Sequence, residues 1–114
     1  MDPYISVIIP VFNRANFVNE AIDSVLNQTL EKEKYEIIVV TNVDIPLKKG
    51  VKIVKLENKW QGPIIYDGIN EARGEIICPL DDDDLFLPNK LEVVYNLFKK
   101  NSNLGLFKHP AIFW

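Results

Sequence analysis

The chain has only one cysteine, Cys78, and only one histidine, His109, among its 114 residues. A single cysteine excludes an intrachain disulfide, a zinc site built from cysteines and a redox pair. Cys78 lies within an apolar run, so we expect a buried and unreactive thiol. A histidine can titrate near neutral pH, but His109 stands alone beside Pro110, and we expect its role to be structural.

Basic stripes and long hydrophobic runs are also missing. Lysine and arginine total 13 against 16 aspartates and glutamates, a formal net charge of −3, so no nucleic acid partner is expected. No apolar stretch approaches the roughly 18 residues of a membrane-spanning helix, and the first residues lack the regions of a signal peptide. We therefore expect no transmembrane segment and a place in the cytoplasm or at the cytoplasmic face of the membrane.

Hydrophobic residues make up 47% of the chain, enough for one domain, residues 1–114, with its own core. Runs rich in β-branched residues predict strands at residues 5–9, 36–40, 51–56, 76–80 and 104–107. Helices are predicted after Asn16 as a cap, over about 63–72, and from Pro88 as a first residue. We expect Pro10 to end the first strand and Gly74 to be left-handed. The alternation predicts an α/β three-layer sandwich: a mostly parallel sheet with helices on both faces.

Four consecutive aspartates, Asp81 to Asp84, follow the predicted strand that ends at Leu80. Two unit charges about 5 Å apart repel by roughly 0.8 kcal/mol even in water, so the cluster favours a cation that offsets the repulsion. Carboxylate oxygens suit Mg²⁺ or Mn²⁺, and Mg²⁺ leaves positions open for phosphates and water. The cluster indicates a metal–diphosphate site; the alternative is a solvated acidic turn.

Two other segments fall where predicted strands end, and ligands bind outside the carboxyl ends of strands in open parallel sheets. After the first strand, Phe12 would stack on a base or belong to the core. After the second, Asn42 in the segment from Thr41 to Asp44 would contact a base edge or ribose, or form only a turn. The three segments together predict a ligand site at one edge of the sheet.

Several blocks of the sequence resemble those of one enzyme family. They are residues 6–14 (SVIIPVFNR), 21–29 (AIDSVLNQT), 35–40 (YEIIVV), 72–77 (ARGEII) and 80–91 (LDDDDLFLPNKL). From Ser6 to about Leu106 the chain resembles the N-terminal, nucleotide-sugar-binding half of a family 2 glycosyltransferase with the Rossmann-like GT-A fold. The resemblance implies a truncated fold that lacks the acceptor-binding half.

The resemblance also implies roles for individual residues. Asp81 and Asp83 match the family's Asp-x-Asp motif and would hold Mn²⁺ or Mg²⁺, Asp83 as the main ligand and Asp81 also facing the sugar or ribose. Asp82 would be the variable residue, pointing away by strand-like alternation, and Asp84 would cap the next turn. The residues implied in nucleotide-sugar binding are Pro10, Val11, Phe12, Asn13, Arg14, Asn42, Asp81 and Asp82.

The chain departs from the family pattern in two places. Asn42 stands where the family usually has an acidic residue for the base, and its amide oxygen would still accept from a uracil N3–H. Ile65 and Tyr66 stand where the family often has Arg-Asn, so a cationic contact to the donor would be lost or come from Arg14 or Arg73. The alternative for Arg73, which we favour, is a solvated charge at the end of a helix. The general base is not identified, because no segment matches the family's second half.

Three hypotheses follow for function. The first is a metal-dependent, inverting transfer of a sugar from a UDP- or GDP-linked donor to an unknown acceptor. The second is a sugar-phosphate nucleotidylyltransferase. That enzyme would need a glycine-rich basic loop after the first strand, and residues 10–14 contain no glycine. The third is a non-catalytic nucleotide- or metal-binding module, or an assembly domain that self-associates through the apolar residues 110–114.

Overall fold

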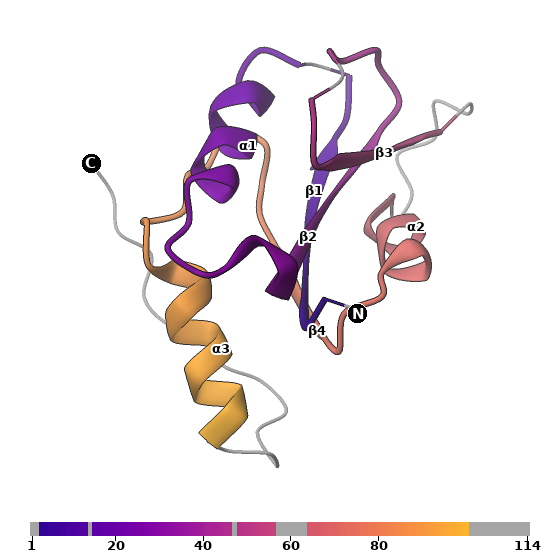
Figure 1. Cartoon of the computed structure of the whole chain (residues 1–114). Helices are drawn as coiled ribbons and strands as arrows, with labels where there is room; N and C mark the ends of the chain where they lie inside the picture. The colour runs from indigo at the N-terminus through magenta and orange to yellow at the C-terminus, as the bar shows by residue number, and fades with distance from the viewer. Residues whose placement is uncertain (1–2, 14, 47, 57–63, 101–114) are drawn as a thin grey trace.

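The computed structural model describes residues 3–13, 15–46, 48–56 and 64–100 (Figure 1). The expected strand at 104–107, the apolar residues 110–114, His109 and Arg14 lie outside these residues. The elements are β1 (Ile5–Val11), α1 (Val18–Leu26), the 3-10 helix η1 (Lys32–Lys34), β2 (Tyr35–Thr41), β3 (Val51–Lys55), α2 (Ile64–Glu71), β4 (Ile76–Pro79) and α3 (Lys90–Lys100). None of the helices in the described part is long and apolar enough to cross a membrane.

The described strands form one parallel sheet in the order β3-β2-β1-β4. The chain adds β2 and β3 on one side of β1 and then returns to place β4 on the other side. The strand order therefore reverses at β1, and the carboxyl ends of β1 and β4 flank the reversal point. The parallel sheet expected from the sequence is confirmed, with β3 at an edge.

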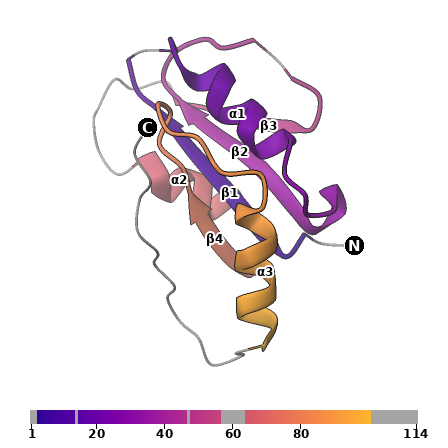
Figure 2. The ribbon, with the colours of Figure 1, turned by 90° about the vertical axis from the view of Figure 1, so that its left-hand side faces the viewer.

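Helices cover both faces of the sheet. Alternate side chains of β1, such as Val7 and Ile9, belong to the core beneath α1 and α3. Ile8 faces the other way, with Ile38 and Val40, toward the side covered by α2. Figure 1 shows α2 on the opposite side of the strands from α1 and α3, and Figure 2 shows α1 and α3 in front of the sheet. The three-layer arrangement is confirmed.

The prediction that Pro10 ends the first strand is wrong, since β1 continues to Val11. The carbonyl oxygens of Tyr4 and Ile8 accept hydrogen bonds from the backbone N–H groups of Ile76 and Leu80. The backbone N–H and C=O groups of even-numbered residues of β1 therefore point toward β4. Strand β4 ends at Pro79, which is opposite Ile8. The nitrogen of Pro10 therefore points past the end of β4, where a missing N–H costs no ladder hydrogen bond.

Two predicted helix starts also differ. Helix α1 begins at Val18 with Phe17 as its N-cap residue, and no side chain caps it, so Asn16 is not the cap. Helix α3 begins at Lys90, and Pro88 lies in the turn before it. Burial of the apolar face of α1, including Val18 and Ile22, fixes its position without a side-chain cap.

Gly74 is not left-handed as predicted, because Gly50 is the glycine with positive φ (84°) in the described residues. Gly74 is needed for space. A Cβ there would lie 2.7 Å from Ser6 Oγ and 2.8 Å from the backbone nitrogen of Ser6. Only glycine lets the α2–β4 connection approach the start of β1 this closely.

Candidate metal and nucleotide site

The aspartates after β4 form a tight turn and not a continuation of the strand. The backbone N–H of Asp84 donates to the carbonyl of Asp81 at 3.1 Å. Asp81, Asp83 and Asp84 are exposed, whereas Asp82 is only 9% exposed. The prediction that strand-like alternation separates Asp82 from its neighbours is therefore wrong, because these residues form a turn. The turn sets Asp82 apart as the buried member and leaves the other three together.

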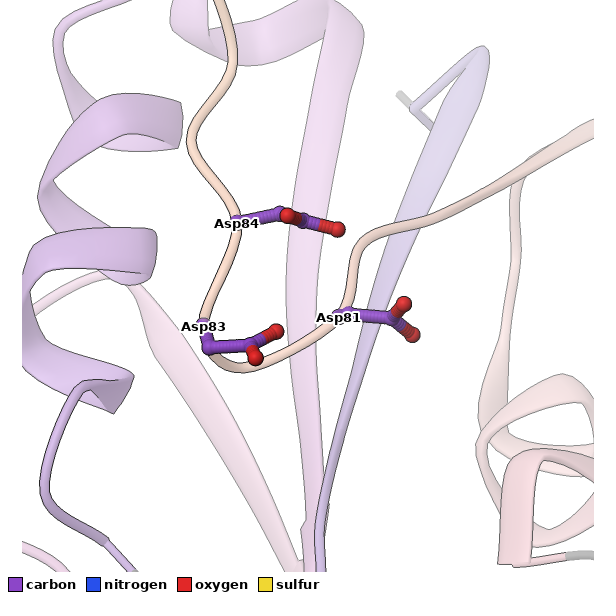
Figure 3. A group of neighbouring side chains, drawn as sticks. All are labelled: Asp81, Asp83 and Asp84. Carbon is purple, nitrogen blue, oxygen red and sulfur yellow. The ribbon is translucent and has the colours of Figure 1, made fainter. Parts of the chain in front are cut away.

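The three exposed carboxylates converge. One oxygen from each of Asp81, Asp83 and Asp84 lies within 4.8 Å of the other two. Figure 3 shows the side chains of Asp83 and Asp84 pointing across the turn toward Asp81, whose own side chain points out of the turn. Asp84, which we expected to cap the next turn in preference to binding metal, is thus a third potential ligand. The signal in the sequence was its spacing, because a four-residue turn brings its first and last residues together.

This geometry fits a small divalent cation. Mg²⁺ holds oxygens at about 2.1 Å, so two opposite ligands lie about 4.2 Å apart. Neighbouring ligands of such an ion lie about 3 Å apart, so with separations of up to 4.8 Å the exposed side chains must rotate toward one another to bind one ion together. The donor set contains only oxygen, which is the set that Mg²⁺ and Mn²⁺ prefer.

The electrostatics of the turn also favour a cation. Partial burial and then the negative charges of Asp84, Asp83 and Asp82 raise the pKa of Asp81 above its ordinary value. The folded chain therefore holds Asp81 in a place that disfavours its ionised form. A bound divalent cation would offset both causes.

A pair of asparagines joins the loops after β1 and β2. The backbone N–H of Asn13 donates to Oδ1 of Asn42 at 2.8 Å, and Nδ2 of Asn42 donates to Oδ1 of Asn13 at 2.9 Å. Asn13 has a φ of 65°, in the left-handed region that asparagine tolerates. The two bonds fix the Asn42 amide and leave one lone pair on its oxygen and one hydrogen on its nitrogen.

The neighbouring residues of β1 have different environments. The Val11 side chain is fully buried, so only its backbone is left for a ligand, and its carbonyl accepts the N–H of Asn42 at 3.4 Å. Pro10 and Phe12 are half-buried. The half-burial of Phe12 is compatible with both alternatives for its ring, stacking on a base or packing in the core.

Arg73 lies near the amino ends of the strands, at the opposite end of the sheet from the aspartates. Its backbone N–H donates to Glu36 Oε2 at 2.7 Å, its Nε lies 3.6 Å from Glu36 Oε1, and Glu36 also accepts from the Ser6 hydroxyl. Ser6 and Glu36 are near the amino ends of β1 and β2. The interpretation of Arg73 as a donor contact is therefore wrong, because the aspartates lie at the carboxyl ends.

The same contacts determine the ionisation of Glu36. Burial alone would raise the pKa of Glu36, but hydrogen bonds from Ser6 and the Arg73 backbone, with the charge of Arg73, outweigh it and lower the pKa. This network ties the segment before β4 to the start of the sheet. It is a structural anchor remote from the aspartates.

Residues 6–109 match the family model described as "Glycosyl transferase family 2". An "Uncharacterized glycosyltransferase" of Rickettsia bellii (strain RML369-C) is 40% identical over 120 residues, covering 96% of this chain and 17% of the relative. The chain thus spans less than a fifth of the length of this relative, and 37% of that of an "Uncharacterized glycosyltransferase alr2836" of Nostoc sp., which is 30% identical over 118 residues.

Two solved structures share the fold. S. aureus TarS 1-349 in complex with UDP-GlcNAc superposes with a TM-score of 0.77 at 22% identity, covering 87% of this chain and 32% of TarS. The mannosyltransferase PcManGT from Pyrobaculum calidifontis, in complex with GDP-Man and Mn²⁺, has a TM-score of 0.60 at 22% identity, covering 75% and 29%. These likenesses confirm the GT-A-type α/β fold that the sequence predicted.

Proposed function

Because the chain belongs to glycosyl transferase family 2, we propose that it is the nucleotide-sugar-binding part of a metal-dependent glycosyltransferase. It would act on a nucleoside diphosphate sugar and transfer the sugar to an acceptor. The observation that carries the proposal is the convergence of Asp81, Asp83 and Asp84 where the strand order reverses. This is the place where open α/β sheets bind ligands.

The metal role falls to Asp83 and Asp81, with Asp84 as a third ligand. When bound, Mn²⁺ or Mg²⁺ would offset the negative charge that develops on the diphosphate as the sugar leaves. The residues themselves supply an all-oxygen donor set held at one side of a turn. Binding the cation would also relieve the repulsion that raises the pKa of Asp81.

The nucleoside would lie along the ends of β1 and β2. Pro10, Phe12, Asn13 and Arg14 would line one side, and Asn42 would meet the base through its remaining lone pair or its remaining hydrogen. A lone pair suits the N3–H of uracil, and the hydrogen suits a base carbonyl. UDP- and GDP-linked donors are both proposed, since the similar folds were solved with UDP-GlcNAc and with GDP-Man.

The rest of the reaction is proposed from the family alone. Inversion at the anomeric carbon requires a general base within hydrogen-bond reach of the acceptor hydroxyl, and we assign that role to no residue of this chain. A cytoplasmic place, or one at the cytoplasmic face of the membrane, stays a prediction.

Calorimetry with UDP and with GDP, each with and without Mn²⁺, tests the proposal. We expect one nucleotide to bind at least roughly tenfold more tightly with Mn²⁺, a gain of about 1.4 kcal/mol. Asp83→Ala should abolish this gain without unfolding the chain, and Asp81→Ala should weaken it. The control is Glu33→Gln, which removes one exposed carboxylate from η1 at the amino edge of the sheet.

A chain that binds neither nucleotide in either condition would contradict the proposal. Self-association without nucleotide affinity would favour the assembly module instead. Unfolding caused by Asp83→Ala would reassign the aspartates to a structural role.

A further inference from the structure

We propose that Ser24 and Gln28 of α1 are positioning residues for the aspartate turn. They hold the backbone that follows the aspartates and so keep Asp83 and Asp84 converged on Asp81. This inference rests on the proposed function, because it concerns the metal-dependent binding of the diphosphate. Neither residue would touch the nucleotide or the metal.

Ser24 links α1 directly to the chain after the aspartates. Its hydroxyl donates to the carbonyl of Ala21 at 2.6 Å and accepts from the backbone N–H of Phe86 at 3.1 Å. Phe86 is two residues beyond Asp84. The bond to Ala21 fixes the hydroxyl hydrogen, so the oxygen lone pairs are directed away from the helix and toward Phe86.

Gln28 makes the second link, just past the end of α1. Its Nε2 donates to the carbonyl of Leu87 at 2.7 Å and to that of Ser24 at 2.9 Å, and its Oε1 accepts from the backbone N–H of Leu91 at 2.8 Å. The side chain is only 7% exposed. Both amide hydrogens and the oxygen are used, so the amide has one possible orientation. Gln28 thereby satisfies a free N–H in the first turn of α3.

The segment from Leu85 to Asn89 needs these contacts because it belongs to neither a helix nor a strand. Phe86 packs against the core, but Leu85 and Leu87 on either side of it are exposed, so burial of these two side chains does little to hold the segment. A backbone bond from Thr29 to the carbonyl of Pro88, at 2.8 Å, supports the same attachment. Mutual repulsion among the carboxylates would otherwise open the turn.

A purely structural role would lower stability without a specific effect on metal-dependent binding. The matched comparison is with Ser6, whose hydroxyl also accepts a backbone N–H from a following segment, that of Gly74 at 2.8 Å. Ser6 lies near the amino end of β1, at the edge opposite the aspartates. Ser6→Ala therefore removes an equivalent bond from the wrong end of the sheet.

The experiment measures UDP and GDP affinity with and without Mn²⁺, and thermal unfolding, for the wild-type chain, Ser24→Ala, Ser24→Thr and Ser6→Ala. Ser24→Ala should fold, since alanine is the better helix former. We expect it to reduce the Mn²⁺-dependent gain in affinity roughly three- to tenfold, the loss that one neutral hydrogen bond accounts for. Metal-free affinity should not change. Ser24→Thr, which keeps the hydroxyl, should restore the gain.

Ser6→Ala should lower the unfolding temperature and leave the Mn²⁺-dependent gain intact. An unchanged gain in Ser24→Ala, or an equal loss in Ser6→Ala, overturns the positioning role while the proposed function stands. A wild-type chain whose affinity shows no Mn²⁺-dependent gain overturns both, since no metal-dependent binding would remain to be positioned.

Discussion

Asp81 combines two features of the proposed site, exposure to solvent and an unfavourable electrostatic environment. Partial burial and three neighbouring carboxylates raise its pKa. Such a group lowers the stability of the folded chain when it ionises, and a cation that binds only the folded chain restores it. Asp81 is therefore suited to bind a metal ion. Without the ion, its ionised carboxylate lowers the stability of the folded chain.

This gives a prediction about pH. An unfolded chain would ionise Asp81 near its ordinary pKa of 3.8, whereas the folded chain does so at a higher pH. In that window the folded state binds more protons, so stability falls as pH rises through it. Metal-free Asp81→Asn should therefore gain in unfolding temperature relative to wild type between about pH 3 and pH 6.

Glu36→Gln is the control of opposite sign. The pKa of Glu36 is lowered, so its stabilisation is present above its unfolded pKa and is lost as pH falls through the folded value. The unfolding temperature of Glu36→Gln should fall further below that of wild type as pH rises over the same range. Parallel trends in the two variants would contradict the electrostatics described for the turn.

The sequence identified the residue types of the site better than their orientation. Asp81, Asp83, Asn13 and Asn42 were predicted from motif and strand-end position, and the structure brings the two asparagines into contact. The burial of Asp82 and the approach of Asp84 to Asp81 were not predictable from a strand pattern, because a turn begins two residues after β4 ends. The contact of Arg73 with Glu36 depends on a pairing across 37 residues.

Among the described elements, the strands and α2 were predictable, whereas the starts of α1 and α3 were not. Runs such as Ile37 to Val40 are β-branched and fully apolar, which specifies a buried strand by composition alone. The start of α3 receives its cap from Gln28, a residue 63 positions before Leu91, and α1 has no side-chain cap. Local sequence signals cannot report contacts made across the fold.

Helix α2 offers a prediction about packing. A Cβ on Gly68 would lie 2.6 Å from Ile8 Cγ2 and 2.8 Å from Val40 Cγ2, both buried in the sheet. Gly68→Ala should therefore destabilise the chain by about 1–3 kcal/mol from overpacking, less about 1 kcal/mol from better helix propensity. Urea unfolding measures the shift in midpoint.

The control for this change is Asn70→Ala on the same helix. Asn70 is exposed, so alanine there brings the propensity gain without a clash. Its midpoint should equal or exceed that of wild type. A Gly68→Ala midpoint that rises as far as that of Asn70→Ala would contradict the close approach of α2 to the sheet.

The overall fold was predictable in outline, because the order of strands and helices along the chain determines where the strand ends lie. Strands joined through helices form a parallel sheet, and their carboxyl ends meet at one edge. The order β3-β2-β1-β4 then puts the aspartate turn beside β1, at the same edge of the sheet as the two bonded asparagines that follow β1 and β2. One fold-level property thus gathers three segments that are each a weak signal alone.

The proposed function depends on a divalent cation, held by Asp83 and Asp81, that contacts the diphosphate of the donor. Anomalous diffraction from crystals grown with Mn²⁺ and the nucleotide that binds tests it most directly. We expect one strong manganese peak about 2.2 Å from carboxylate oxygens of the aspartate turn and from the diphosphate. A nucleotide bound at the ends of β1 and β2 with no manganese at the turn, or with manganese elsewhere, would contradict it.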